Sequence, residues 1–80
     1  MNIKELNRTL NKNKNIPKEA FSIINGGYQF PGDTYCLNIL NGKFEYYYSE
    51  RGGKRGLKEF DNEEEACEYF YNLLMDRFDK

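Results

Sequence analysis

The chain has 80 residues, a net charge of −1 and an aromatic content of six Phe and seven Tyr. A chain of this length forms one domain, residues 1–80, whose core is too small to enclose a large active-site cavity. It contains no histidine, and no stretch approaches the roughly 20 apolar residues of a membrane span. Residues 1–20 carry five bases and two acids, whereas residues 59–80 carry eight acids and two bases. We therefore expect a small domain with a basic beginning and an acidic end that does not span a membrane.

The first element in the chain is a short amphipathic helix. Ile3, Leu6 and Leu10 recur at a spacing of three and four residues among polar side chains, which is typical of a helix with one apolar face. Pro17 disfavours helical geometry at Ile16. The helix must therefore end before this point, and we expect Ile16 to pack onto the core.

A short strand is predicted next, at residues 20–24, where apolar and polar side chains alternate. The Asn-Gly-Gly sequence at 25–27 predicts a turn. Residues 28–33 then form a loop with two aromatic side chains, Tyr28 and Phe30. Such rings are either binding anchors or lids over the edge of the core.

The centre of the chain predicts a β-hairpin. Asn41-Gly42 separates two runs of alternating residues, and this dipeptide tolerates the positive φ angles of a type I′ turn. Because side chains alternate across a strand, each run has one core face and one solvent face. Tyr47 falls on the polar face and is the aromatic that we expect to be most exposed to water. We assign to the core face Tyr35, Leu37, Ile39, Phe44, Tyr46 and Tyr48.

The last strand and helix complete the expected fold. Residues 51–54 form a second turn, residues 55–60 a further strand, and residues 62–77 a helix that opens with a capping residue and several acids. The apolar stripe of this helix consists of Ala66, Cys67, Phe70, Leu73, Leu74 and Phe78. The predicted class is α+β, in the order α-β-β-β-β-α. We expect a single antiparallel sheet of three to four strands, covered by an N-terminal and a C-terminal helix.

The side-chain inventory favours a protein that is not an enzyme. The usual general base, histidine, is missing, and no Ser or Cys has a recognisable catalytic partner. Clustered glutamates at the start of a helix are typical of capping and solvation rather than of a catalytic carboxylate pair. Cys36 and Cys67 lack metal-ligand spacing, so we expect no metal and no cofactor. They are either reduced thiols of a cytoplasmic protein or a disulfide between sheet and helix.

Two classes of binding protein remain. Arg51, Lys54, Arg55 and Lys58 lie near three consecutive tyrosines at 46–48, a combination that suits phosphates and stacked bases. The isoelectric point near 5.4 weighs against this nucleic-acid alternative. The acidic last helix favours protein binding instead, because its charges can steer a basic partner.

Several short motifs are spread over the chain: IPKEAFS at 16–22, NGG at 25–27, YCL at 35–37, YYSERG at 47–52, GLK at 56–58, FD at 60–61 and EAC at 65–67. Together they resemble a family of small bacterial immunity proteins, which belong to polymorphic toxin and contact-dependent growth inhibition systems. The likeness covers about residues 16–75. Its most specific part is YYSERG followed by LK and an acidic helix that contains cysteine. The segment 28–33 is longer than the link that is usual in the family.

The resemblance implies a cytoplasmic protein that binds the C-terminal domain of a cognate toxin and occludes its active site stoichiometrically. It implies no catalysis and no membrane partner, and we expect a monomer. We place toxin binding first on the solvent face of the sheet and its second turn, at Glu45, Tyr47, Glu50 and Arg51. The start of the last helix is the second candidate surface, with Glu63, Glu64 and Glu68.

Overall fold

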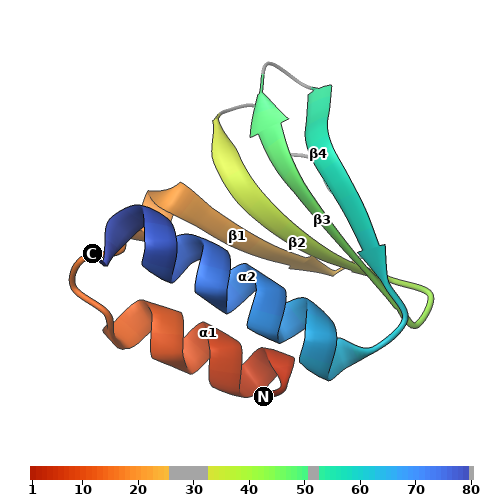
Figure 1. The fold of residues 1–80 in the computed structure, drawn as a ribbon, viewed down its shortest axis with the longest axis horizontal. Coiled ribbons are helices and arrows are strands. Elements are labelled where there is room, and N and C mark those ends of the chain that lie inside the picture. Colours follow the sequence, from red (N-terminus) through yellow and green to blue (C-terminus); the bar gives the residue numbers. More distant parts are fainter. Residues whose placement is uncertain (26–32, 51–52, 80) are drawn as a thin grey trace.

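The computed structural model describes residues 1–25, 33–50 and 53–79. Two helices lie side by side on one face of a four-stranded sheet (Figure 1). The elements are α1 Ile3–Lys12, a short 3₁₀ helix η1 Lys18–Ala20, β1 Phe21–Asn25, β2 Thr34–Leu40, β3 Lys43–Glu50, β4 Gly53–Phe60 and α2 Glu63–Phe78. The predicted α+β class and its α-β-β-β-β-α order are confirmed. We call the face of the sheet that is turned away from the helices the outer face.

The sheet is mixed, which corrects the expectation of an antiparallel sheet. Its strand order is β1-β2-β3-β4. The β2–β3 and β3–β4 pairs are antiparallel, but β1 runs parallel to β2, with Phe21 opposite Tyr35. Parallel pairing excludes a tight hairpin, because the chain has to return to the end of the sheet where β1 began. Most of the turn predicted at 25–27 and of the loop predicted at 28–33 lies outside the described residues.

The predicted type I′ turn between β2 and β3 is confirmed. Asn41 has a φ of 50° and Gly42 a φ of 78°, so both central residues adopt the left-handed conformation that this turn requires. β4 begins at Gly53, two residues before the predicted start at Arg55. Residues 51–52 of the predicted second turn lie outside the described residues.

A β-bulge interrupts the β3–β4 pair. Tyr46 lies opposite Lys58, but Tyr48 lies opposite Arg55, so two residues of β4 face the single residue between them on β3. Gly56, one of these two residues, has a φ of 62°. A glycine in the left-handed region is the usual first residue of this type of bulge. The bulge therefore shifts the pairing of β4 by one residue.

The two helices run in the same direction and are joined at both ends (Figure 1). At the first end, the Glu63 carboxylate of α2 accepts a hydrogen bond of 2.8 Å from the backbone N–H of Ile3 in α1. At the other end, the side-chain amides of Asn13 and Asn15 donate to Asp79, at 3.2 and 2.7 Å. A carboxylate at a helix N-terminus also offsets the positive end of the helix dipole.

The main core lies between α1, α2 and the sheet. It confirms the predicted helix stripe and the assignment of Leu37 and Tyr46 to the core face, and Ile16 is buried as expected. Tyr35 and Phe44 are half-buried and pack against this core, and Ile39 and Tyr48 are half-buried as well. The buried residues are Leu6, Leu10, Ile16, Phe21, Leu37, Tyr46, Ala66, Cys67, Phe70 and Leu74.

The outer face carries a second, smaller cluster, which consists of Ile24, Cys36 and Tyr47. Tyr47 is only 1% exposed, so the expectation that it faces water is wrong. The expectation assumed that one face of the sheet is fully solvated, as it is in many antiparallel sheets. β2 and β3 are the central strands of this sheet, and away from their shared turn they carry buried side chains on both faces. Among the described residues, no helix is long and apolar enough to cross a membrane.

Candidate functional site

The predicted binding residues of the sheet do not form one surface. Glu45 lies on the outer face, whereas Glu50, an odd number of positions away on the same strand, projects to the opposite face. Both carboxylates also hold cations of β4. Glu45 pairs with Lys54 at 2.9 Å, and Glu50 pairs with Nε of Arg55 at 2.7 Å. Tyr47 is buried, and Arg51 lies outside the described residues.

The described cations of the basic strip that suggested nucleic-acid binding are engaged within the protein, and Arg51 lies outside the described residues. The Lys54 ammonium lies 4.8 Å from the centre of the Tyr47 ring and pairs with Glu45. The Lys58 ammonium lies 5.0 Å from the centre of the Tyr69 ring, and Arg55 is held by Glu50. Tyr46 and Tyr47 are buried. The strip therefore does not present the aromatic platform that stacked bases require.

The three predicted glutamates of α2 have different roles. Glu63 accepts the hydrogen bond from Ile3 and so holds the two helices together. Glu64 and Glu68 are exposed, and neither forms an ion pair with a described residue. Glu63 is thus a structural residue, whereas Glu64 and Glu68 are available to a partner.

Glu59 is a surface acid that the sequence analysis missed. It lies directly opposite Glu45 on the neighbouring strand. At the turn end of this hairpin, Glu50 pairs with Gly53 and Ser49 with Lys54. The same register continued without a bulge would place Lys58 opposite Glu45. The shift at the bulge places Glu59 there instead, and the signal that could have revealed it is a glycine inside a predicted strand.

The resulting pair of like charges is unfavourable in the isolated protein. Like charges directly opposite each other on neighbouring strands destabilise a sheet, within a range of about 0.2–1 kcal/mol for cross-strand pairs. Lys54 offsets part of this cost through Glu45. Glu59 forms no ion pair with the described residues.

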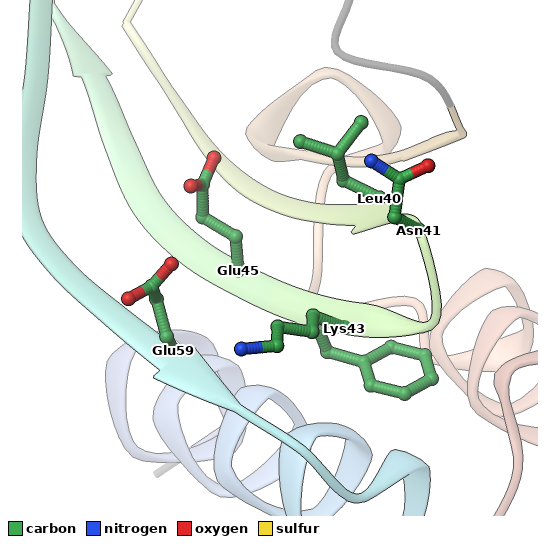
Figure 2. A pocket seen from close by; sticks show the side chains of 6 residues that line it. Leu40, Asn41, Lys43, Glu45 and Glu59 are labelled. Atoms are coloured by element: carbon green, nitrogen blue, oxygen red, sulfur yellow. The ribbon is translucent and has the colours of Figure 1, made fainter.

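Glu45 and Glu59 line a hollow on the outer face, which we call the outer hollow. Its volume is about 260 Å³, and its lining consists of Leu40, Asn41, Lys43, Phe44, Glu45 and Glu59. Figure 2 shows the two carboxylates on adjacent strands, with Leu40 on the far side of the hollow. Leu40 is 43% exposed. The outer hollow thus combines two carboxylates with an exposed apolar side chain.

A second hollow, which we call the helix hollow, lies between the end of β4 and α2. Its volume is about 290 Å³, and it is lined by Phe60, Glu65, Glu68, Tyr69 and Asn72. The rings of Phe60 and Tyr69 contact each other, with centroids 5.4 Å apart. Because Glu59 and Phe60 are consecutive, the two hollows lie on either side of the end of β4.

The two hollows bring acids of the sheet and of α2 to one end of the molecule. In Figure 1, the tip of the β2–β3 hairpin and the start of α2 both lie next to the end of β4. We call this region the acidic corner. It consists of the acids that line the two hollows, Glu45, Glu59, Glu65 and Glu68, together with Asp61, which pairs with Lys43 of the outer hollow, and Glu64 in the first turn of α2. It joins part of the predicted sheet surface to part of the predicted helix surface.

The two cysteines do not form a disulfide. Both are free and buried. Cys36 belongs to the cluster on the outer face and Cys67 to the main core, so the sheet separates them. Burial raises the pKa of the Cys36 thiol, and it raises the pKa of Cys67 to about 11. Both thiols are therefore poor nucleophiles at neutral pH. Across the described ranges, no group of three or more side chains is arranged to hold a metal ion.

Comparison with known proteins finds no matching family model, no similar curated protein and no similar solved structure. The resemblance to immunity proteins therefore stays a prediction from the sequence motifs.

Proposed function

We propose that this chain is a cytoplasmic immunity protein, which binds the C-terminal domain of a cognate bacterial toxin and neutralises it by occluding its active site. The sequence motifs suggest the class of partner, and the acidic corner suggests the docking surface. In this mechanism the chain performs no catalysis. It acts as a stoichiometric inhibitor, and its affinity for the toxin domain comes from surface complementarity.

The observation that carries the proposal is the convergence of unpaired acids at the end of β4. Glu59, Glu64, Glu65 and Glu68 form no ion pairs with the described residues. Toxins that attack nucleic acids or nucleotide cofactors often have basic or anion-binding sites for phosphate groups. A rigid acidic surface can occupy such a site in place of the substrate. Charge complementarity of this kind also raises the rate of association.

Charge reversal at the acidic corner tests this proposal. We suggest Glu59→Lys combined with Glu68→Lys, which alters one acid of each hollow without removing an ion pair among the described residues. The partner in the assay is the product of the neighbouring gene, which the proposal expects to end in a toxin domain. We expect the dissociation constant of the complex between the double variant and this partner to rise at least about 30-fold, which corresponds to about 2 kcal/mol of binding free energy. Protection of cells that express the toxin should be lost.

The matched control is Glu19→Lys combined with Asp76→Lys. Both residues are exposed acids outside the corner, and Asp76 follows Glu68 by eight positions along α2, a distance of about 12 Å. This control should protect as well as the parent. Full protection by the corner variant would overturn the docking surface. Failure to bind the neighbouring gene product, together with salt-sensitive retention on single-stranded RNA, would favour the nucleic-acid alternative.

A further inference from the structure

We propose that the outer hollow is a binding site for an arginine side chain supplied by the protein partner. The identity of that partner depends on the proposed function. The chemistry of the site depends only on the described residues of β2, β3 and β4.

The register of the β3–β4 pair places two carboxylates side by side. The bulge at Gly56 places Glu59 opposite Glu45, although a regular hairpin would place Lys58 there. The isolated protein thus has two acids, Glu45 and Glu59, opposite each other. A shift of β4 by one residue would instead place the cation of Lys58 opposite Glu45. A cation inserted between the carboxylates would convert this repulsion into attraction on both sides.

The two carboxylates have the capacity to accept further hydrogen bonds. A carboxylate has about four acceptor sites. Glu45 uses one oxygen for Lys54, at 2.9 Å, and Glu59 has no ion-pair partner among the described residues. Lys43, the cation at the rim of the hollow, pairs with Asp61 at 3.8 Å rather than with either glutamate. The acceptor sites of Glu59 are therefore open to a ligand.

The lining of the outer hollow favours an arginine side chain over a simple cation. A guanidinium group is planar, carries five N–H donors and can bind two carboxylates at once, whereas an ammonium group acts as a point charge. The hollow also exposes Leu40 beside the carboxylates. The aliphatic stem of an arginine can cover this apolar surface while its charged end reaches the glutamates. Leu40 thus matches the aliphatic stem of an arginine, and the two glutamates match its guanidinium group.

A titration followed by NMR tests the site without the toxin. The probe is N-acetyl-arginine methylamide, added to the ¹⁵N-labelled full chain. We expect saturable shifts of the amide signals of Leu40, Glu45 and Glu59, which weaken as salt is added. The citrulline analogue, which has the same shape but no charge, should cause no such shifts. Equal shifts with both compounds, or none with the arginine compound, would overturn the proposal.

A pair of variants separates the site from general acidity. Glu59→Gln should raise the dissociation constant of the probe at least fivefold, whereas Glu68→Gln, an acid of the helix hollow, should leave it unchanged. The thermal midpoint of Glu59→Gln should equal or exceed that of the parent, because the repulsion of Glu45 is removed. A lower midpoint with unchanged probe binding would show that Glu59 serves the fold and not a ligand.

The outcome for this site is independent of the outcome for the immunity function. If the probe does not bind but the corner variant loses protection, the arginine site is wrong and the docking surface stands. If the probe binds but the chain gives no protection against the neighbouring toxin, the site stands and the immunity function is wrong.

Discussion

The ring of Tyr47 stabilises the folded protein, whereas its buried hydroxyl does not. The ring is buried in the outer cluster, beneath the ammonium of Lys54. The hydroxyl is also buried, and it makes no hydrogen bond to a nitrogen or oxygen of the described residues. Burial raises the pKa of Tyr47 to about 12, and the neighbouring Cys36 thiol adds to this increase. The contribution of this residue to stability should therefore come from the ring.

Two substitutions at Tyr47 separate the ring from the hydroxyl. Tyr47→Phe removes a buried polar group without a strong partner, so the free energy of unfolding should stay within about 0.5 kcal/mol of the parent or increase. Tyr47→Ala removes the ring and should cost about 3–5 kcal/mol. Urea unfolding measures both changes. A loss of about 2 kcal/mol in the phenylalanine variant would mean that the hydroxyl has a partner in solution.

At the scale of the elements, two glycines determine how the strands of the sheet align. Gly42 completes the tight turn between β2 and β3, and Gly56 starts the bulge in β4. A Cβ atom at either position would meet no atom within 4 Å. Their positive φ angles alone therefore make other residues unfavourable there, since L side chains adopt this conformation at a cost.

Alanine substitutions test this explanation. Gly42→Ala and Gly56→Ala should each lower the free energy of unfolding by about 1 kcal/mol, because each places a Cβ atom in the left-handed region. Gly53→Ala is the matched control; its φ is not in this region, and the nearest atom to its Cβ would lie at 3.4 Å. The control should be neutral within about 0.5 kcal/mol. Equal losses for all three variants would show that β4 tolerates no added side chain, whatever its backbone conformation.

At the scale of the whole molecule, two buried thiols and two buried tyrosine hydroxyls make the free energy of unfolding depend on pH in alkaline solution. Burial raises the pKa of Cys36, raises that of Cys67 to about 11, and raises those of Tyr46 and Tyr47 to about 12. The ordinary values are 9.0 for Cys and 10.0 for Tyr. The unfolded chain therefore releases these protons at a lower pH than the folded chain does.

We expect the free energy of unfolding to fall as the pH rises from about 9 to about 12. The stabilisation is fully present below the unfolded pKa values and is lost through the folded ones. Each group contributes up to about 1.4 kcal/mol per pH unit while it titrates only in the unfolded state. Urea unfolding over this range measures the slope, and Tyr47→Phe should make it shallower. A constant stability between pH about 9 and 11 would contradict the burial of these groups.

The features that the sequence predicted correctly are local. Asn41-Gly42 specifies its turn through two neighbouring backbone conformations, and the helix at 62–77 follows from its cap and its apolar stripe. The errors concern long-range arrangement. The parallel direction of β1 and the burial of Tyr47 depend on how distant segments assemble, and alternation along one strand cannot reveal this.

Only part of the candidate site could be predicted, because the rest also depends on how distant segments assemble. Glu64 and Glu68 are exposed, as the position of acids on a helix face suggests. Glu63 is held by a backbone group 60 residues earlier in the chain. The importance of Glu59 depends on a bulge that shifts its partner by one residue. Both facts become visible only when the segments are placed in space.

The hydrogen bonds that join α1 to α2 determine when the protein can acquire its structure during synthesis. The partner of Ile3 lies 60 residues further along the chain, and that of Asn15 lies 64 residues further. α1 has only 10 residues, and a helix of this length is marginal in water without tertiary support. As the nascent chain leaves the ribosome, α1 therefore lacks its tertiary partner and cannot form a stable helix until α2 has also emerged.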